Sequence, residues 1–444
     1  MNKALVVLLG MCLTYSASAD NKDVSSAPSF IVYKIKPGDT LHKLVQKYMV
    51  QAVDLEDLQK VNHLQNLNLL PIGADLNIPR HLVKTNPSNA TIMGLSCATA
   101  IRLDNSNKPL TVGAVITEGA VIQVPAECHV SLLLEDSSII RLPSSASLKI
   151  TTLRKNALES TPEVKLDLAR GRIELDVNKN RSKSTPFEVR TPISIMGVRG
   201  TEFRVGYSPE DQAGQVEVLG GIVETRGSAD ASSQAITKGL GVPIDSDGKA
   251  LGVEKLLDAP VFETAHATPG SQPSFVAKLT AVPLASYYVA NNTSTANLAG
   301  QRISQNLLSP ELFIPKLGKQ ISFYQLTSVS ESGLVGPDRH YGFCAAPAEI
   351  TAARCSAIFD APLADGSAIS FSLSKNVGGI HTPLINTQTL QARNGRFAIQ
   401  GLPAGHYSWT LSYAMRDTSS AGSANHPIRQ SGAFELIPLS AHQP

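Results

Sequence analysis

The carboxylates and histidines that could do acid–base chemistry are scattered along this chain and form no known catalytic pattern. Glu135 and Asp136 are adjacent acids that could form a hydrolase pair, but nothing in the sequence singles them out. Asp245 and Asp247 lack the third acid of a calcium loop, which favours a solvated turn. The sequence contains no G-x-S-x-G, H-E-x-x-H, phosphate-loop or dinucleotide-binding glycine motif. We therefore expect no enzymatic activity, no cofactor and no metal site.

The first residues are typical of a cleaved export signal. In residues 1–19, Lys3 precedes a short apolar run over 4–13, and Ala17-Ser18-Ala19 fits the small-residue cleavage rule. The apolar run is shorter than the ~20 residues that a spanning helix needs, which disfavours a membrane anchor. A lipidation site at Cys12 is the other alternative, disfavoured by the large residue before it. We expect export to the periplasm.

Four cysteines follow the predicted signal: Cys97, Cys128, Cys344 and Cys355. An even number in an exported chain favours disulfides, and three connectivities are open. The local pairs Cys97–Cys128 and Cys344–Cys355 are the predicted ones. Buried free thiols or a metal site are the alternatives, although no C-x-x-C pattern supports zinc.

Length and charge limit the remaining classes of function. A chain of 444 residues is too long for one core and indicates three or four domains. A formal net charge of +2, without a long basic run, argues against a nucleic-acid partner, because such binding depends on phosphate neutralisation. No later segment is apolar enough to cross a bilayer, so we expect a soluble mature chain without a transmembrane segment.

After a polar tether over 20–29, residues 30–80 combine two kinds of periodicity. Residues 31–35 alternate as a half-buried strand does. A turn at 37–40 leads into an amphipathic helix that begins near Leu41, and Asp54 can cap a second helix. Apolar residues return in alternation at 76–78. The pattern predicts a strand, two helices and a returning strand.

Segment 30–80 resembles the LysM module along nearly its full length. The resemblance rests on Pro37-Gly38-Asp39-Thr40-Leu41, on Asn62 and on the ending Ile78-Pro79. It implies a βααβ fold that binds N-acetylglucosamine-containing glycans, in bacteria usually peptidoglycan, in a groove between two loops. Carried over to this sequence, the glycan-binding residues are Gly38, Asp39, Thr40 and Leu41, and Asn68, Leu69, Leu70 and Pro71.

The chemistry of these loops fits that role. An N-acetyl group needs backbone donors and acceptors and an apolar floor for its methyl, and a glycine in the turn lets the backbone come close. The alternative is that Gly38 and Asp39 only shape a turn and cap a helix. A single copy gives no avidity, so we expect weak binding that relies on a high local glycan concentration.

Residues 91–226 change to short β runs bounded by turn residues, which predicts an all-β domain, either a sandwich or a stacked β-roll. This segment resembles the FecR domain, with a Thr-Pro pair, then V-R-G-T-x-F, then a later strand with Gly and Val; Ser137 replaces the usual Gly of an upstream turn. The motif residues are Thr191, Pro192, Arg199, Gly200, Thr201 and Phe203.

The role of Arg199 has two interpretations. It could contact a carboxylate of an acidic partner or of a glycan peptide. Alternatively, Gly200 forms a tight bend and Arg199 lies over a neighbouring carboxylate or carbonyl, which we favour. Family members with a membrane-spanning helix relay signals to sigma factors. That role does not transfer to this chain, which lacks such a helix after cleavage.

The rest of the chain reads as a linker and two β-sandwiches. Residues 227–254 are rich in Gly and Ser and predict a linker. The run at 324–337 resembles a fibronectin type III-like sandwich, placed over 255–345. Residues 394–407 are similar to carboxypeptidase-regulatory-like β-sandwiches, placed over 346–440. Despite the name, the latter domains are not catalytic.

These features together predict a multidomain, mainly β envelope protein, in which a small βααβ module precedes an all-β domain and two sandwiches. The expected function is non-catalytic: binding to peptidoglycan and presentation of the FecR-like domain to an envelope partner as a scaffold or sensor. Two alternatives stay open. One is a peptidoglycan-remodelling enzyme whose active site is not recognised, and the other is a periplasmic signalling partner of a receptor.

Overall fold

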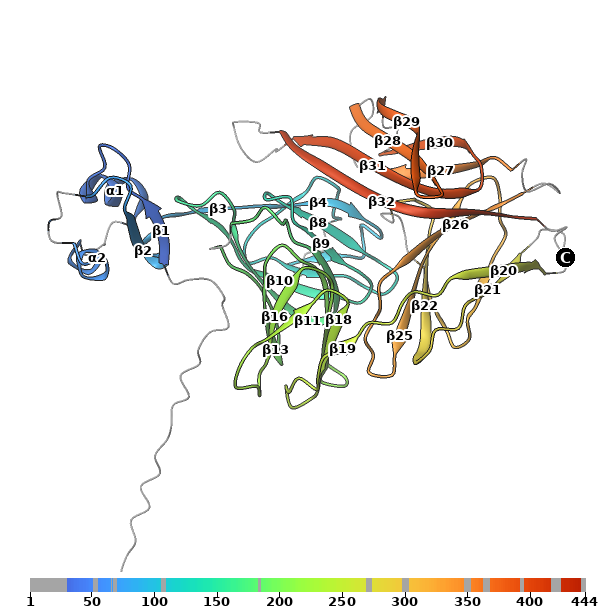
Figure 1. Cartoon of the computed structure of the whole chain (residues 1–444), viewed down its shortest axis with the longest axis horizontal. Helices are drawn as coiled ribbons and strands as arrows, with labels where there is room; N and C mark the ends of the chain where they lie inside the picture. Colours follow the sequence, from blue (N-terminus) through green and yellow to red (C-terminus); the bar gives the residue numbers. More distant parts are fainter. Residues whose placement is uncertain are drawn as a thin grey trace, which may run out of the picture.

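The computed structural model consists of a small amino-terminal unit followed by three β-rich units (Figure 1). It describes residues 30–50, 55–64, 66, 70–104, 109–182, 185–268, 274–297, 303–346, 353–361, 368–391, 395–416 and 425–440. The predicted signal peptide and tether lie outside these residues. Within the described residues, no helix combines the length and apolar character that crossing a membrane requires.

The amino-terminal unit has the predicted order of elements: β1 (Phe30–Lys34), α1 (Leu41–Tyr48), α2 (Leu55–Asn62) and β2 (Asp75–Pro79). The two strands pair antiparallel, and both helices pack their apolar faces on them around Leu44, Leu58 and Leu76. The side chain of Asn62 bonds to both the N–H and the C=O of Asn77, which fixes α2 against β2.

The central unit is built from seventeen strands, β3 to β19, in two sheets packed face to face. The strands are β3 (Thr85–Pro87), β4 (Ala90–Leu95), β5 (Arg102–Leu103), β6 (Val115–Ile116), β7 (Val121–Gln123), β8 (Val130–Leu134), β9 (Ile139–Leu142), β10 (Ser147–Asn156), β11 (Glu163–Asp176), β12 (Phe187–Thr191), β13 (Ser194–Val198), β14 (Glu202–Ser208), β15 (Ala213–Gly220), β16 (Ile222–Gly227), β17 (Gln234–Thr237), β18 (Leu240–Ile244) and β19 (Glu254–Lys255).

The long strand β11 connects the two sheets of the central unit. Its first half pairs with β10 and β12, and its second half pairs with β9 and β14. Buried aliphatic side chains from both sheets form one core between them. The sequence predicts a linker at 227–254, but β17, β18 and the first residue of β19 lie within this segment and pair into these sheets.

Two sandwiches follow, and they share one eight-stranded sheet. The first contains β20 (Phe262–Ala267), β21 (Phe275–Leu279), β22 (Ala285–Thr293), β23 (Ile303–Leu307), β24 (Glu311–Ile314), β25 (Ser322–Ser330) and β26 (Arg339–Ala345). The second contains β27 (Cys355–Asp360), β28 (Ala368–Val377), β29 (Ile380–Gln391), β30 (Arg396–Leu402), β31 (Gly405–Arg416) and β32 (Asn425–Leu439). The mainly β, multidomain fold is as predicted.

A parallel pairing makes the shared sheet continuous. The strand order is β23-β22-β25-β26-β32-β31-β28-β29, and β26 runs parallel to β32 with Tyr341 opposite Glu435 (Figure 1). The long β32 therefore closes the second sandwich and binds it to the first. Because backbone hydrogen bonds cross the junction, the two sandwiches form one body.

The amino-terminal unit is also fixed to its neighbour. The guanidinium of Arg80 donates to both carboxylate oxygens of Glu159 at 2.6 and 3.0 Å, and the two side chains are 14% and 4% exposed. The backbone of Lys84 bonds to Tyr48 and to Ala157, and β3 continues from there into the central sheets. This buried bidentate contact orients one unit on the other.

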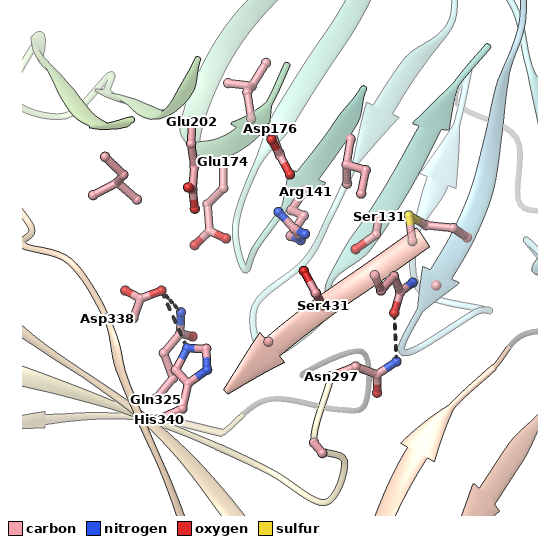
Figure 2. A pocket seen from close by; sticks show the side chains of 18 of the residues that line it. Ser131, Arg141, Glu174, Asp176, Glu202, Asn297, Gln325, Asp338, His340 and Ser431 are labelled. Carbon is pink, nitrogen blue, oxygen red and sulfur yellow. Dashed lines mark hydrogen bonds and ion pairs between the residues drawn. The ribbon is translucent and has the colours of Figure 1, made fainter. Parts of the chain in front are cut away.

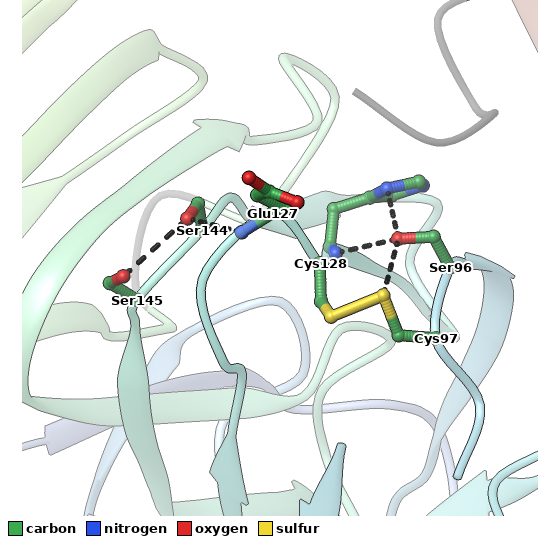
Figure 3. Close-up of a disulfide and its surroundings, with 7 residues drawn as sticks. Ser96, Cys97, Glu127, Cys128, Ser144 and Ser145 are labelled. Carbon is green, nitrogen blue, oxygen red and sulfur yellow. Dashed lines mark hydrogen bonds between the residues drawn. A yellow bond between two sulfur atoms is a disulfide. The ribbon is translucent and has the colours of Figure 1, made fainter. Parts of the chain in front are cut away.

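Both predicted disulfides form. Cys97 and Cys128 are joined over a sequence separation of 31, with a Cα–Cα distance of 5.7 Å (Figure 3). Cys344 and Cys355 are joined over a separation of 11. The first closes a loop within the central unit, and the second links β26 to β27, one strand from each sandwich.

We expect the two disulfides to differ in their effect on stability. The longer loop loses more chain entropy in the unfolded state, so Cys97→Ser with Cys128→Ser should lower the free energy of unfolding by about 3–4 kcal/mol. The pair Cys344→Ser with Cys355→Ser should cost less. Urea unfolding of both double variants measures this. An equal or reversed order would contradict the loop-entropy account.

Candidate functional site

The first predicted binding loop is a tight turn between β1 and α1. Gly38 has a φ of +84° with open space beside it, a conformation that favours glycine. The Asp39 carboxylate accepts from the backbone N–H of Lys36 at 2.8 Å and from the Tyr33 hydroxyl at 2.9 Å. The Thr40 hydroxyl caps α1 by accepting from the N–H of Lys43 at 3.3 Å. The turn is thus held in place by its own polar side chains.

The second binding loop lies directly beside the first. The backbone N–H of Gly73 donates to the Ile35 C=O at 2.9 Å, and the Ile35 N–H donates to the C=O of Ala74 at 3.0 Å. These bonds bring Pro71, which is exposed, and Ile72, which is 68% exposed, next to the Gly38 turn. Ile72 was not predicted, although an exposed β-branched residue in a short polar loop was a usable signal.

The predicted loop residues therefore divide by role. Leu41 is 1% exposed, so its side chain lies in the core beneath the turn. Leu70 is half-buried and packs against the same core. Asn68 and Leu69 lie outside the described residues. Among the described residues, 36–38 and 71–73 are the exposed parts of the two loops.

Electrostatics reinforce the turn. Burial, together with the bond to Asp39, raises the pKa of Tyr33 to about 12, so its hydroxyl stays a donor at neutral pH. The N–H of Lys36 and the Tyr33 hydroxyl lower the pKa of Asp39, so its carboxylate stays an acceptor. The hydrogen bond from Tyr33 to Asp39 therefore persists at neutral pH and keeps the turn in this conformation.

The second predicted motif is mostly structural. Phe203 and Thr201 are fully buried, and the Thr201 hydroxyl donates to the Ile222 C=O at 3.4 Å. Gly200 has a φ of +60°, and a Cβ there would lie 2.9 Å from the Lys179 Cα, so only glycine fits this bend. Thr191 contacts the Ser194 hydroxyl at 2.7 Å beside the exposed Pro192, which shapes the β12–β13 hairpin.

Arg199 differs from the favoured prediction. It is exposed, and its side chain forms no hydrogen bond or ion pair with the described residues. The expected neighbouring carboxylate or carbonyl is thus not its partner, because the bend at Gly200 turns residue 199 outward from the sheet.

A row of alternating charges crosses the outer face of one sheet in the central unit. Register places Arg141 of β9 opposite Glu174 of β11, Glu174 opposite Arg204 of β14, and Arg204 opposite Glu217 of β15. The intervening residues, such as Leu175 and Phe203, point into the core. Sequence reasoning missed this row because its members are far apart in the chain.

The first sandwich covers this row. Its loop between β25 and β26 inserts between the units: Arg204 donates to the C=O of Gly336 at 2.8 Å and is ion-paired with Asp338. The N–H of Val335 donates to Glu217 at 3.1 Å, and Glu217 is fully buried. An outer sheet face that would otherwise meet water is therefore an interface between domains.

Burial and charge oppose one another at this interface. Burial by itself would lower the pKa of Arg204, but the carboxylates of Asp338, Glu174 and Glu217 outweigh it and raise that pKa. Burial would raise the pKa of Asp338, but Arg204, with His340 and Gln325, lowers it far below its ordinary value. Both side chains therefore stay charged at neutral pH.

A cavity of about 260 Å³ lies beside the Arg204–Asp338 pair, where the central unit meets both sandwiches. Figure 2 shows Arg141, Glu174, Asp176 and Glu202 directed into this space, with Ser431 across from them. Partial burial and the nearby Asp176 raise the pKa of Glu202. The cavity is polar, and charges of both signs line it.

Ser96 and His129 form a serine–histidine contact, a combination that also occurs in catalytic sites. The Ser96 hydroxyl lies 3.0 Å from Nδ1 of His129 and accepts the His129 backbone N–H at 3.0 Å beside the Cys97–Cys128 disulfide (Figure 3). His129 is 4% exposed. Because this pair is buried and holds the disulfide loop in place, we assign it a structural role. No group of three metal-ligating side chains occurs among the described residues.

Comparison with protein families identifies the first two units. Residues 33–79 match the LysM domain, and residues 120–224 match the family described as FecR protein. The chain contains a LysM domain and a FecR domain. Both predicted resemblances are confirmed, and neither family is catalytic. The two sheets of the FecR domain extend beyond the matched residues on both sides, from β3 to β19.

Solved structures are only distantly similar. A proposed anti-sigma factor from Parabacteroides distasonis ATCC 8503, solved at 1.65 Å, is 21% identical over 30% of this chain and 59% of its own length, with a TM-score of 0.26. The extracellular domain of a one-component system from B. thetaiotaomicron is 11% identical over 84% of this chain and 64% of its own, with a TM-score of 0.14. Scores this low carry no argument. No curated protein matches the chain.

We expect Arg204→Met to destabilise the protein by about 3–5 kcal/mol, because it leaves Asp338 buried without its partner. The double variant Arg204→Met/Asp338→Leu should recover most of that loss. Urea unfolding measures both. Arg170→Met is the matched control, since the Arg170–Glu210 pair is exposed and should contribute about 1 kcal/mol or less. An equal effect at both sites would contradict the assigned role.

The Arg204–Asp338 pair predicts that the stability of the protein depends on pH. The folded pKa of Asp338 is lower than its unfolded value of about 4, so its contribution is complete above pH ~4. The contribution is lost as the pH falls from there toward the folded pKa. Stability of the wild type should therefore fall more steeply below pH ~4 than that of Asp338→Asn. Parallel acid-unfolding slopes would refute this.

Proposed function

We propose that this protein is a non-catalytic envelope protein that binds peptidoglycan through its LysM domain. The observation that supports this most directly is the pair of loops joined through the backbone of Ile35, in which Gly38 of one loop and Ile72 of the other are both exposed. The Gly38 turn offers backbone to the polar part of an N-acetyl group, and Ile72 offers an apolar surface to its methyl. A single groove of this kind gives weak, reversible binding.

The FecR domain and the two sandwiches are proposed to act as a scaffold or sensor for an envelope partner. Support comes from the fixed contacts along the chain: Arg80 with Glu159 at one end and Arg204 with Asp338 at the other. A body held in this way keeps its other surfaces at a set orientation to the bound polymer. Exposed Arg199 is the residue we assign to contact with an acidic partner.

A glycan test uses the full mature chain and purified sacculi. Gly38→Val should reduce co-sedimentation at least severalfold, because it strains the turn and covers the backbone. Gly113→Val is the matched control: its φ of +86° and open surroundings equal those of Gly38, but it lies in the FecR domain. The control should sediment like the wild type.

Two outcomes would contradict the proposal. Failure of the wild type to sediment with sacculi would remove peptidoglycan as the ligand. A clearing zone in peptidoglycan zymography would replace binding by catalysis. Crosslinking in cells, compared between the wild type and Arg199→Ala, identifies the envelope partner and tests the role of Arg199.

A further inference from the structure

The cavity between the FecR domain and the sandwiches contains a second pair of opposed charged residues, and both of them are carboxylates. Asp176 of β11 lies directly opposite Glu202 of β14. Each is two residues along its strand from a member of the alternating row. Like charges directly opposite on neighbouring strands are destabilising. On the other side of Asp176, register places the apolar Ile139. The pair of carboxylates therefore has no cation beside it in its own row.

Several charges in this cavity have no direct partner. The side chains of Arg141, Asp176 and Glu202 form no hydrogen bond or ion pair with the described residues, yet all three point into the same space (Figure 2). The described lining residues include five carboxylates and three guanidinium groups, and one of the carboxylates, Asp360, is ion-paired with Arg396 outside the lining. They are Glu174, Asp176, Glu202, Asp338 and Asp360, and Arg141, Arg204 and Arg429.

The opposite wall supplies an independent observation. Trp409 of β31 is 6% exposed, lines the cavity, and its indole Nε1 has no hydrogen-bond partner among the described residues. Oδ2 of Asp360, which also lines the cavity, is likewise buried without a partner. Buried polar atoms are nearly always hydrogen-bonded, so these two atoms are available to a polar occupant of the cavity.

We propose that this cavity binds a small cationic amino acid or dipeptide. Its ammonium groups lie against Asp176 and Glu202, where they relieve the repulsion between the two carboxylates. Its carboxylate lies against Arg141, as a charge-assisted pair. The remaining donor and acceptor are Trp409 Nε1 and Asp360 Oδ2.

The size and construction of the cavity support this class of ligand. A volume of about 260 Å³ lies just below the range of about 300–1,000 Å³ for pockets that hold drug-sized ligands, which excludes a glycan chain. The walls come from the FecR domain and both sandwiches, so occupancy depends on all three being docked. The site is separate from the LysM groove, and it stands or falls independently of peptidoglycan binding.

The test is calorimetric titration of the full mature chain with lysyl-alanine. Two analogues isolate its charges: diacetyl-lysyl-alanine lacks both ammonium groups, and lysyl-alanine amide lacks the carboxylate. We expect saturable binding of lysyl-alanine, and at least tenfold weaker binding of both analogues, since a charged hydrogen bond contributes about 1.5–3 kcal/mol. Glu202→Gln, Asp176→Asn and Arg141→Gln should each weaken lysyl-alanine binding by a similar factor.

Glu224→Gln is the control, because Glu224 lies on β16 in the other sheet, outside the cavity. It should bind lysyl-alanine like the wild type. The variants Asp176→Asn and Glu202→Gln keep side-chain shape and remove a repulsion, so they should unfold at or above the wild-type temperature. Absence of saturable binding to the wild type, or equal binding by the three cavity variants, would overturn the proposal and leave solvent as the occupant.

Discussion

The alternating row Arg141–Glu174–Arg204–Glu217 is the interaction on which the arrangement of the domains depends. One face of an antiparallel sheet is commonly left to water, and here that face is covered by a loop of the next domain. Charges can be placed there because directly opposed residues of the row carry opposite charges, and the two inner members, Glu174 and Arg204, have an opposite charge on both sides. Arg204 is the central member, because it is ion-paired with both Glu174 and Asp338, and its removal leaves the buried Asp338 without its arginine, so this contact favours a single docked geometry.

Fixed contacts also join the other neighbouring units of the described chain. A bidentate arginine holds the LysM domain, buried charges hold the first sandwich, and a parallel strand pairing holds the second. A protein built in this way differs from domains joined by flexible linkers, because its distal surfaces keep a set distance and direction from the LysM domain. That property suits a scaffold or a sensor.

Docking also creates the cavities. The Arg204–Asp338 pair lies beside the cavity that contains Asp176 and Glu202, and a second cavity lined by Arg204, Asp338 and Tyr287 lies on its other side. Strands that fit perfectly face to face would leave no such spaces. Here Arg204 and Asp338 line both cavities, so space remains next to their contact.

Local patterns allowed much of this protein to be predicted. The alternation at 31–35 and the helix that begins at Leu41 gave the LysM elements, and the short β runs over 91–226 predicted an all-β unit. Both disulfides are the local pairs that we favoured among three possible connectivities. Gly38 and Gly200 mark turns because backbone conformation is a local property. These features need only neighbours in sequence.

Other features depend on partners that are distant in sequence. Arg204 and Asp338 are 134 residues apart, and nothing near either one signals the other. The glycines of 234–255 made this segment resemble a linker. Its strands form only by pairing with residues distant in the sequence, which no local pattern shows. Asp176 and Glu202 become neighbours only through strand register. The sequence by itself determined the elements, turns and families; the tertiary structure alone decided which charges meet, because register and domain docking set distances that no local pattern encodes.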